Sequence, residues 1–155
     1  MARAAAPWVD AGPFRAHLRH VMGVGDLTAT EVATLAGVPP RLAVSLAEGR
    51  AGRPVRKISP ATARALLQVT AADARGLRSR QVPAAESRRR LGRLRRQGVG
   101  LPELATGLGV GADELTTLAA PHTSWCSALL ALRLLTLARV TAGDDADPAP
   151  VPLAA

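Results

Sequence analysis

The sequence predicts an all-α protein, and three observations carry this prediction. The chain has 155 residues, of which 48% are hydrophobic but only 2% aromatic. A core of Ala, Leu and Val has little bulk per residue, which suits closely packed helices better than sheets. Capping signals mark several helix starts, and the pattern of one half of the chain recurs in the other. We therefore expect two helical units of similar design.

An internal repeat relates the two halves of the chain. Residues 9–25 align with residues 82–98, and after the loss of one residue 31–38 align with 103–110. Each copy contains a long helix, a glycine-containing turn, a short helix that carries Glu, an aliphatic residue and Ala, a Gly-Val turn, and another short helix. Such a duplication predicts two related structural units.

The first copy is expected over residues 9–69. Thr28 and Glu31 have the spacing of a capping box, so the second helix of this copy should begin there. Gly37 should end that helix in a left-handed cap. Two prolines then suit the first turn of a third helix, at residues 39–48, because the missing amide protons would have no partner in that turn.

The apolar residues of the third helix predict its inward face, which should consist of Leu42, Val44, Leu46 and Ala47. Residues 50–58 should form a basic loop. Ser59 followed by Pro60 predicts the start of a fourth helix, which should run to about Val69.

The second copy is expected over residues 82–140, after a polar linker at 70–81. Its helices are expected at about 84–97, 102–108 and 112–119, with a final apolar helix from Thr123 or Ser124 to Val140. Residues 1–8 should be a flexible arm. Residues 141–155, acidic and rich in proline, should be a disordered tail.

The charge balance points to a polyanionic partner. Twenty basic residues against 12 acidic ones give a net charge of +8 and a pI near 11.6, which favours nucleic acid or an anionic membrane surface. The longest apolar stretch, 125–140, is interrupted by arginine and too short to cross a bilayer. We therefore expect a cytoplasmic protein associated with the nucleoid.

The chemistry-bearing residues do not indicate an enzyme. The sequence contains no paired carboxylates, phosphate-binding glycine loop or nucleophile motif, and we expect no cofactor. Cys126 stands alone and should be a buried packing residue. His17 and His20 have a spacing that can share a metal ion but lack a third ligand nearby, so we expect no metal site.

Small and aliphatic residues recur where a helix-turn-helix unit needs its helices to cross. The first copy supplies Ala33, Gly37 and Val38, and the second supplies Ala105, Gly109 and Val110. The sequence resembles small helix-turn-helix DNA-binding proteins of actinobacteria and their phages, here as tandem, diverged copies. The segments that carry this resemblance are Leu35-Ala-Gly-Val38, Gly52-Arg-Pro54, Arg56-Lys-Ile58 and Thr62-Ala-Arg-Ala-Leu-Leu67.

The resemblance is clear over residues 9–69 and weaker over 82–140. It implies that the protein binds double-stranded DNA and that residues 39–48 form the recognition helix. Members of the family usually have several polar residues on this helix, whereas this chain has Pro39, Pro40, Leu42 and Val44. The candidates for reading bases are therefore few, namely Arg41, Ser45 and Glu48. Arg41 is best placed to pair bidentately with guanine, and a solvated surface charge is the alternative.

Two basic clusters are candidates for binding phosphate. The first is the loop beside the recognition helix, with Arg50, Arg53, Arg56 and Lys57. The second lies on the helix at 84–97, where arginines alternate with leucines, and includes Arg88, which aligns with Arg15, and Arg89, Arg93 and Arg96. Like charges at helical spacing repel each other, which favours an anionic partner over a merely solvated face. The acidic start of the helix at 112–119, with Asp113 and Glu114, would instead be repelled by phosphates.

The leading functional hypothesis is a DNA-binding transcriptional regulator. A low-specificity architectural or replication-associated DNA binder is one alternative, and a helix-turn-helix adaptor that binds another protein is a second. The apolar segment 125–137 should be buried, either within a monomer or in a homodimer. We favour the monomer, because a tandem repeat already supplies two DNA-contacting units.

Overall fold

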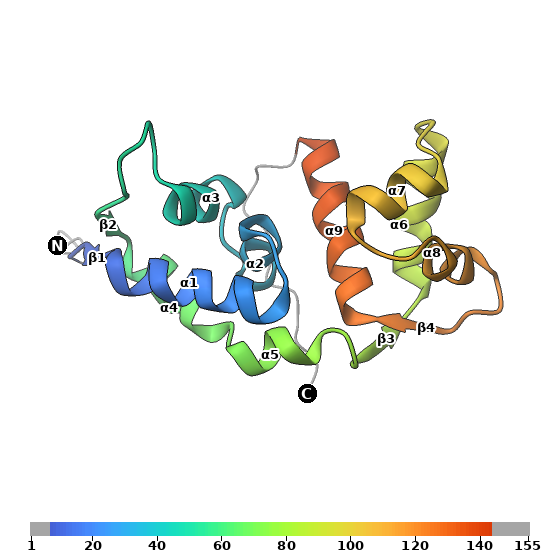
Figure 1. The fold of residues 1–155 in the computed structure, drawn as a ribbon, viewed down its shortest axis with the longest axis horizontal. Coiled ribbons are helices and arrows are strands. Elements are labelled where there is room, and N and C mark those ends of the chain that lie inside the picture. Colours follow the sequence, from blue (N-terminus) through green and yellow to red (C-terminus); the bar gives the residue numbers. More distant parts are fainter. Residues whose placement is uncertain (1–6, 144–155) are drawn as a thin grey trace, which may run out of the picture. The chain divides into compact units, whose positions relative to one another are not determined.

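The computed structural model describes residues 7–143, and in this range it contains nine helices and four short strands (Figure 1). About 65% of the described residues are helical, and the strands among them form only two small two-stranded sheets. The all-α prediction is therefore confirmed. The chain divides into two compact units with their boundary between Arg75 and Gly76, which we call unit 1 and unit 2.

Unit 1 begins with a strand and a long helix and continues through five further elements. These are β1 (Val9–Asp10), α1 (Gly12–Gly25), α2 (Ala29–Ala36), α3 (Pro40–Glu48), β2 (Lys57–Ile58), α4 (Pro60–Gln68) and α5 (Ala71–Gly76). The predicted capping box is confirmed. The Thr28 side chain accepts a hydrogen bond from the Glu31 amide at 3.1 Å, and the Glu31 carboxylate accepts one from the Thr28 amide at 2.8 Å.

The turn from α2 to α3 depends on a left-handed glycine. Gly37 ends α2 with φ of 69°, and the Val38 amide then bonds the Ala33 carbonyl at 3.0 Å. A residue with a Cβ adopts this conformation only at a cost. Helix α3 starts at Pro40 and packs mainly on α2 and α1.

The buried face of α3 differs from the prediction. Leu46 and Ala47 are buried as expected, but the third buried residue is Ala43, whereas Leu42 and Val44 are only half-buried. Positions 43, 46 and 47 follow the i, i+3, i+4 spacing of one helical face. The small Ala43 lets α3 approach its neighbours closely, and the larger Leu42 is left at the surface.

Unit 2 repeats the order of elements from β1 to α4. Its elements are β3 (Gln81–Pro83), α6 (Ala85–Arg96), α7 (Leu101–Leu108), α8 (Ala112–Ala119), β4 (Trp125–Ser127) and α9 (Ala128–Ala142). Gly109 ends α7 with φ of 62°, and the Val110 amide bonds the Ala105 carbonyl at 3.0 Å. The core of this unit is made largely of leucines from α6 to α9: Leu91, Leu94, Leu104, Leu108, Leu115, Leu118, Leu130 and Leu134.

A short antiparallel strand pair closes each unit, which the sequence did not predict. In unit 1, Val9 pairs with Ile58, and in unit 2, Val82 pairs with Cys126. One further backbone bond follows each pair. The Ala11 amide donates to Arg56 at 2.8 Å, and the Ala84 amide donates to Ser124 at 2.9 Å. The start of the first helix is thereby attached to the segment that leads into α4 in unit 1 and into α9 in unit 2.

The final helix begins later than predicted. Ser127 caps α9, because its side chain accepts a hydrogen bond from the Leu130 amide at 3.2 Å. The residues before it form β4, so Trp125 lies on a strand and not on the helix, and its side chain is 59% exposed. Leu130 and Leu134 belong to the core of unit 2. Most of the segment proposed as a dimer interface is therefore not at the surface.

Three segments outside the predicted helices also differ from expectation. The expected linker contains α5, and Ala74 and Leu77 within it are buried. Helix α9 extends into the predicted tail as far as Ala142, and the rest of that tail, 144–155, lies outside the described residues. Residues 1–6 of the predicted arm also lie outside them.

An arginine at the same repeat position ties the helices of each unit together. In unit 1 the Arg15 Nε donates to the Leu46 carbonyl at 3.2 Å, and its Nη2 donates to Val55. In unit 2 the Arg88 Nε donates to the Leu118 carbonyl at 3.1 Å, and its Nη2 donates to Thr123. Arg88 was predicted to bind phosphate, but its guanidinium is directed inward and is occupied, so we remove it from the candidate interface.

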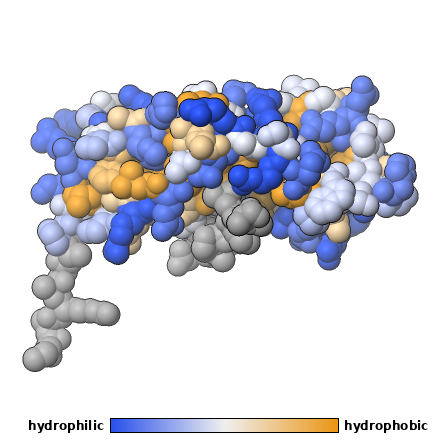
Figure 2. All heavy atoms as spheres, turned by 90° about the horizontal axis from the view of Figure 1, so that it is seen from below, coloured by the Kyte–Doolittle hydropathy of each residue, from blue (hydrophilic) through white to orange (hydrophobic). Residues whose placement is uncertain are grey.

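Hydrophilic side chains cover much of the face drawn in Figure 2, and apolar atoms gather there in smaller patches. Over residues 7–143, the structure contains no helix with the length and apolar character needed to span a membrane.

Replacing Arg88 tests its structural role. Arg88→Ala removes charge-assisted hydrogen bonds to two carbonyls and should lower the free energy of unfolding by about 2 to 3 kcal/mol. The measurement is urea unfolding followed by circular dichroism. The control is Arg95→Ala, which removes an exposed arginine from the same helix and should change stability by less than about 0.5 kcal/mol. Equal effects of the two substitutions would contradict the assigned role.

Candidate nucleic-acid interface

The basic loop after α3 is an ordered hairpin. The Arg50 amide donates to the Arg53 carbonyl at 2.8 Å, and the Arg53 amide donates back to Arg50 at 2.9 Å. Ala51 and Gly52 between them have φ of 48° and 73°. Two central residues with positive φ are the mark of the tight type I′ turn. Figure 1 shows this segment, between α3 and β2, extending away from the helices of unit 1.

Gly49 sets the base of the hairpin. Its φ is 92°, and a Cβ added there would lie 2.7 Å from the Arg53 carbonyl oxygen. A larger residue would both strain the backbone and push the returning strand away. This one glycine therefore both ends α3 and begins the hairpin.

The cations of the hairpin and of the segment after it face solvent. The residues are Arg50, Arg53, Arg56 and Lys57, and each is exposed. Arg50 also donates from Nε to the Ser45 hydroxyl at 3.2 Å. Within residues 7–143, Arg53, Arg56 and Lys57 make no ion pair with a carboxylate. Their charge is therefore available to an anion.

The three candidate base-reading residues have different surroundings on α3. Arg41 is exposed in the first turn, and Glu48 is exposed at the last residue. Ser45 is half-buried, and its hydroxyl accepts the bond from Arg50. Ser45 therefore lies beside the hairpin and also holds the Arg50 side chain through this bond. Of the three residues, Arg41 has the side chain best suited to a guanine edge.

A groove lies between α3, the hairpin and the start of α4, and we call it the unit 1 groove. It has a volume of about 410 Å³, and Trp8, which is 65% exposed, contributes to its wall. Other lining residues are Leu42, Ser45, Arg53, Lys57 and Thr62. The wall combines apolar side chains with three of the four cations described above, Arg50, Arg53 and Lys57.

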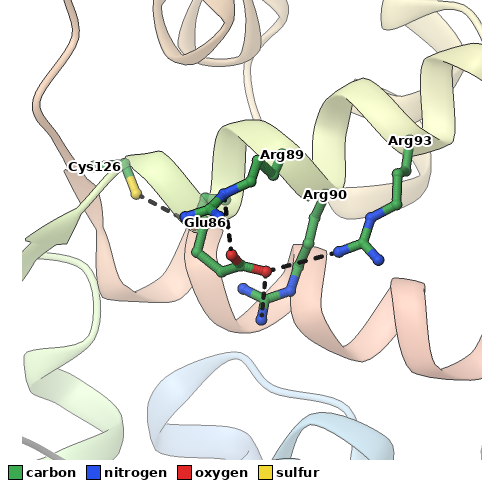
Figure 3. Close-up of polar contacts among 6 residues, drawn as sticks. Glu86, Arg89, Arg90, Arg93 and Cys126 are labelled. Carbon is green, nitrogen blue, oxygen red and sulfur yellow. Dashed lines mark hydrogen bonds and ion pairs between the residues drawn. The ribbon is translucent and has the colours of Figure 1, made fainter.

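The arginines of α6 surround one carboxylate (Figure 3). Glu86 forms ion pairs with Arg89 at 3.3 Å, Arg90 at 3.2 Å and Arg93 at 3.7 Å. Burial lowers the pKa of Arg90, as do the neighbouring arginines, while Glu86 opposes them. Glu86 thus compensates part of the repulsion that the sequence predicts among these arginines. Exposed pairs of this kind add little stability.

The other predicted phosphate-binding residues of unit 2 remain at the surface. Arg89, Arg93 and Arg96 are exposed along α6, and they line an open depression together with Glu86, Arg88 and Gly92. The hairpin cations lie on unit 1 and these arginines on unit 2. The candidate site therefore consists of two basic surfaces, each built on its own unit.

The histidines and the cysteine have structural surroundings. The His17 ring Nε2 lies 3.1 Å from the Leu66 carbonyl and 2.9 Å from that of Val69, at the end of α4. His20 is exposed. Cys126 is buried, and its thiol lies 3.7 Å from the Ser87 hydroxyl. The described part of the chain contains no group of three or more His, Cys, Asp or Glu residues arranged to hold a metal ion.

Compared with known proteins, the chain matches no family model, no curated protein and no solved structure.

The hairpin geometry predicts the effect of a substitution at its tip. Ala51 adopts a left-handed conformation that asparagine tolerates better. Ala51→Asn should therefore raise the free energy of unfolding by about 0.5 to 1 kcal/mol, measured by urea unfolding. Ala51→Val is the matched opposite change and should lower it, because a β-branched side chain is strained at positive φ. A loss of stability in both variants would show that the turn is not of this type.

Cys126 should react slowly with thiol reagents at neutral pH. Burial raises the pKa of its thiol, and the nearby Glu114 charge adds to the shift. Only the thiolate is nucleophilic, so a raised pKa lowers the reactive fraction at every pH below it. An aromatic disulfide reagent should modify the folded protein at least about tenfold more slowly than the urea-unfolded chain, and the rate should climb with pH. Equal rates in the two states would refute this account.

Proposed function

We propose that this protein binds double-stranded DNA and regulates transcription, with α3 of unit 1 as its recognition helix. The observation that carries the proposal is the hydrogen-bonded hairpin at the end of α3, which presents exposed cations without carboxylate partners beside α3. Two backbone bonds join Arg50 and Arg53 across a two-residue turn, and the exposed Arg56 and Lys57 follow shortly after along the chain.

The arrangement of α2 and α3 supports this proposal. The two helices are joined by a tight glycine turn and pack against each other, as the two central helices of a helix-turn-helix unit do. In such units the second helix enters the major groove, and flanking elements contact the backbone. Phosphate contacts fix the register of the protein on the duplex, which is the role we propose for the hairpin.

The arginines of α6 supply a second proposed phosphate contact. Arg89, Arg93 and Arg96 are exposed on one helix of unit 2. Glu86 balances only part of their charge. The tandem units would let one chain contact DNA twice, so we propose that a monomer is the binding species. Light scattering on the free protein tests this point, and a stable dimer would contradict it.

A DNA binder with little sequence preference is the second candidate, and one observation favours it. The Ser45 hydroxyl is bonded to Arg50, and Glu48 is an exposed anion that the phosphates of bound DNA would repel. Arg41 is then the main side chain of α3 for direct readout. Gel-shift titrations against random and genomic DNA fragments at several salt concentrations distinguish the candidates. Selective binding supports a regulator, uniform binding an architectural protein, and no binding at low salt would overturn the proposal in favour of an adaptor.

The double substitution Arg53→Ala with Arg56→Ala should weaken binding to all sequences alike. Each lost phosphate contact should reduce the slope of log K against log salt concentration by about one unit. The matched control is Arg64→Ala with Arg75→Ala, which removes two exposed arginines of unit 1 that lie outside the hairpin. An equal reduction in the control would show that only net charge matters.

Arg41→Ala should relax specificity at one base pair. A bidentate arginine–guanine contact contributes about 1 to 3 kcal/mol of discrimination, and its loss should appear in the preferred site selected from a random duplex library. Identical site preferences in mutant and parent would mean that α3 does not read bases through this residue.

A further inference from the structure

Unit 2 has a groove at the same place in its fold as the unit 1 groove. We call it the unit 2 groove, and its volume is about 220 Å³. The two grooves are lined from matching positions of matching elements. The pairs are Leu42 and Glu114, the third residues of α3 and α8; Ser45 and Thr117, the sixth residues of the same helices; Lys57 and Trp125, the first residues of β2 and β4; Ser59 and Ser127, the caps of α4 and α9; and Thr62 and Leu130, the third residues of α4 and α9.

The chemistry of the two grooves is opposite. At the matched positions, Leu42 of unit 1 is replaced by the carboxylate Glu114, and the cation Lys57 is replaced by the indole Trp125. The hairpin with Arg50 and Arg53 also has no counterpart, because the connection from α8 to β4 carries no arginine or lysine. The repeat has kept the position of the groove and changed the charge of its lining.

The two side chains that set the chemistry of the unit 2 groove, Trp125 and Glu114, are accessible. Trp125 is 59% exposed, which is unusual for the largest apolar side chain in a unit with a leucine core. Glu114 is exposed and accepts a hydrogen bond from the Ser127 hydroxyl at 3.2 Å, which orients its carboxylate. Arg88 lies behind the groove, but its guanidinium is bonded to the Leu118 and Thr123 carbonyls.

We propose that the unit 2 groove binds an arginine side chain presented by a partner protein. A guanidinium can stack on the exposed Trp125 indole, where the negative face of the ring attracts it. The same group can form a charge-assisted bond with Glu114. The groove is smaller than the roughly 300 to 1,000 Å³ of typical small-molecule sites, which suits one inserted side chain rather than a helix or a ligand.

The charge of the groove argues against a nucleic acid in this place. Glu114 and the adjacent exposed Asp113 would repel phosphate. The net charge of the chain is +8, so its overall field repels a cationic peptide. Such a peptide can therefore bind only where local groups, here Trp125 and Glu114, attract it. The proposal does not rest on DNA binding by unit 1, and either can fail without the other.

Nuclear magnetic resonance titration provides the test, because the chain has two tryptophans and each lies in a different groove. Trp8 lines the unit 1 groove and Trp125 the unit 2 groove, so the two indole N–H signals report on them separately. The probe is a capped Gly-Arg-Gly-Arg-Gly peptide, compared with the same peptide carrying citrulline, a neutral planar analogue. The Trp125 indole N–H signal is identified as the one that is missing from the spectrum of the Trp125→Phe variant.

The arginine peptide should move the Trp125 signal saturably, with an apparent dissociation constant on the order of 1 mM or below, and leave the Trp8 signal in place. The citrulline peptide should bind at least about fivefold more weakly, since it lacks the charge. Glu114→Gln should weaken arginine-peptide binding by a similar factor. Glu103→Gln, which removes an exposed carboxylate of α7 outside the groove, is the matched control and should not weaken it.

Three results would overturn the proposal. The first is no movement of the Trp125 signal at millimolar peptide, and the second is equal movement with arginine and citrulline. The third is saturable movement of the Trp125 signal by a DNA oligonucleotide without any by the arginine peptide, which would assign the groove to nucleic acid. The amide spectra of Glu114→Gln and Glu103→Gln, compared with that of the parent, establish that both variants are folded.

Discussion

In each unit, an arginine at the same repeat position bonds the first helix to the third. The cores consist mostly of leucine, valine and alanine, whose packing contacts are not directional. Arg15 and Arg88 add directional contacts, because each reaches from the first helix of its unit to a carbonyl of the third helix and to a carbonyl of the segment that follows. Charge-assisted bonds are directional and costly to leave unmade. This contact joins the first helix, the third helix and the connecting segment, which are the elements that surround the groove of each unit.

The same scaffold then carries different surfaces. In unit 1 the connection from the third helix to the closing strand forms a cationic hairpin, whereas in unit 2 the corresponding connection is uncharged and leads to an exposed tryptophan. The strand pairing and the serine cap that hold these surfaces are alike in both units. A duplicated fold can therefore present two kinds of chemistry without changing its core, because the positions whose charge differs between the grooves, 42 and 114, 57 and 125, are not among the buried core residues.

The sequence predicted the positions of the helices more accurately than the residues of the candidate functional site. Helix caps are local, so Thr28, Gly37 and Ser59 could be assigned from spacing alone. The strands at 57–58 and 125–127 could not, since each is only two or three residues long and exists because a distant segment pairs with it. Arg88 was assigned to phosphate because it lies among other arginines. Its alignment with Arg15 was the available signal for a structural role. Arg15 does not lie in an arginine cluster, so an arginine at this position in both copies is better explained by the shared fold than by phosphate binding.

By itself, the sequence determined the helical class, the duplication, the glycine turns and the strongly basic charge, because all of these depend on composition or on neighbours within a few residues. Tertiary structure alone decided which cations are available. It directed Arg88 inward, set Glu86 among three arginines, ordered residues 50–53 into a hairpin and left Trp125 outside the helix that its neighbours form. The physical reason is that the availability of a side chain depends on which distant carbonyl, carboxylate or strand lies within reach of it, and spacing along the chain carries no such information.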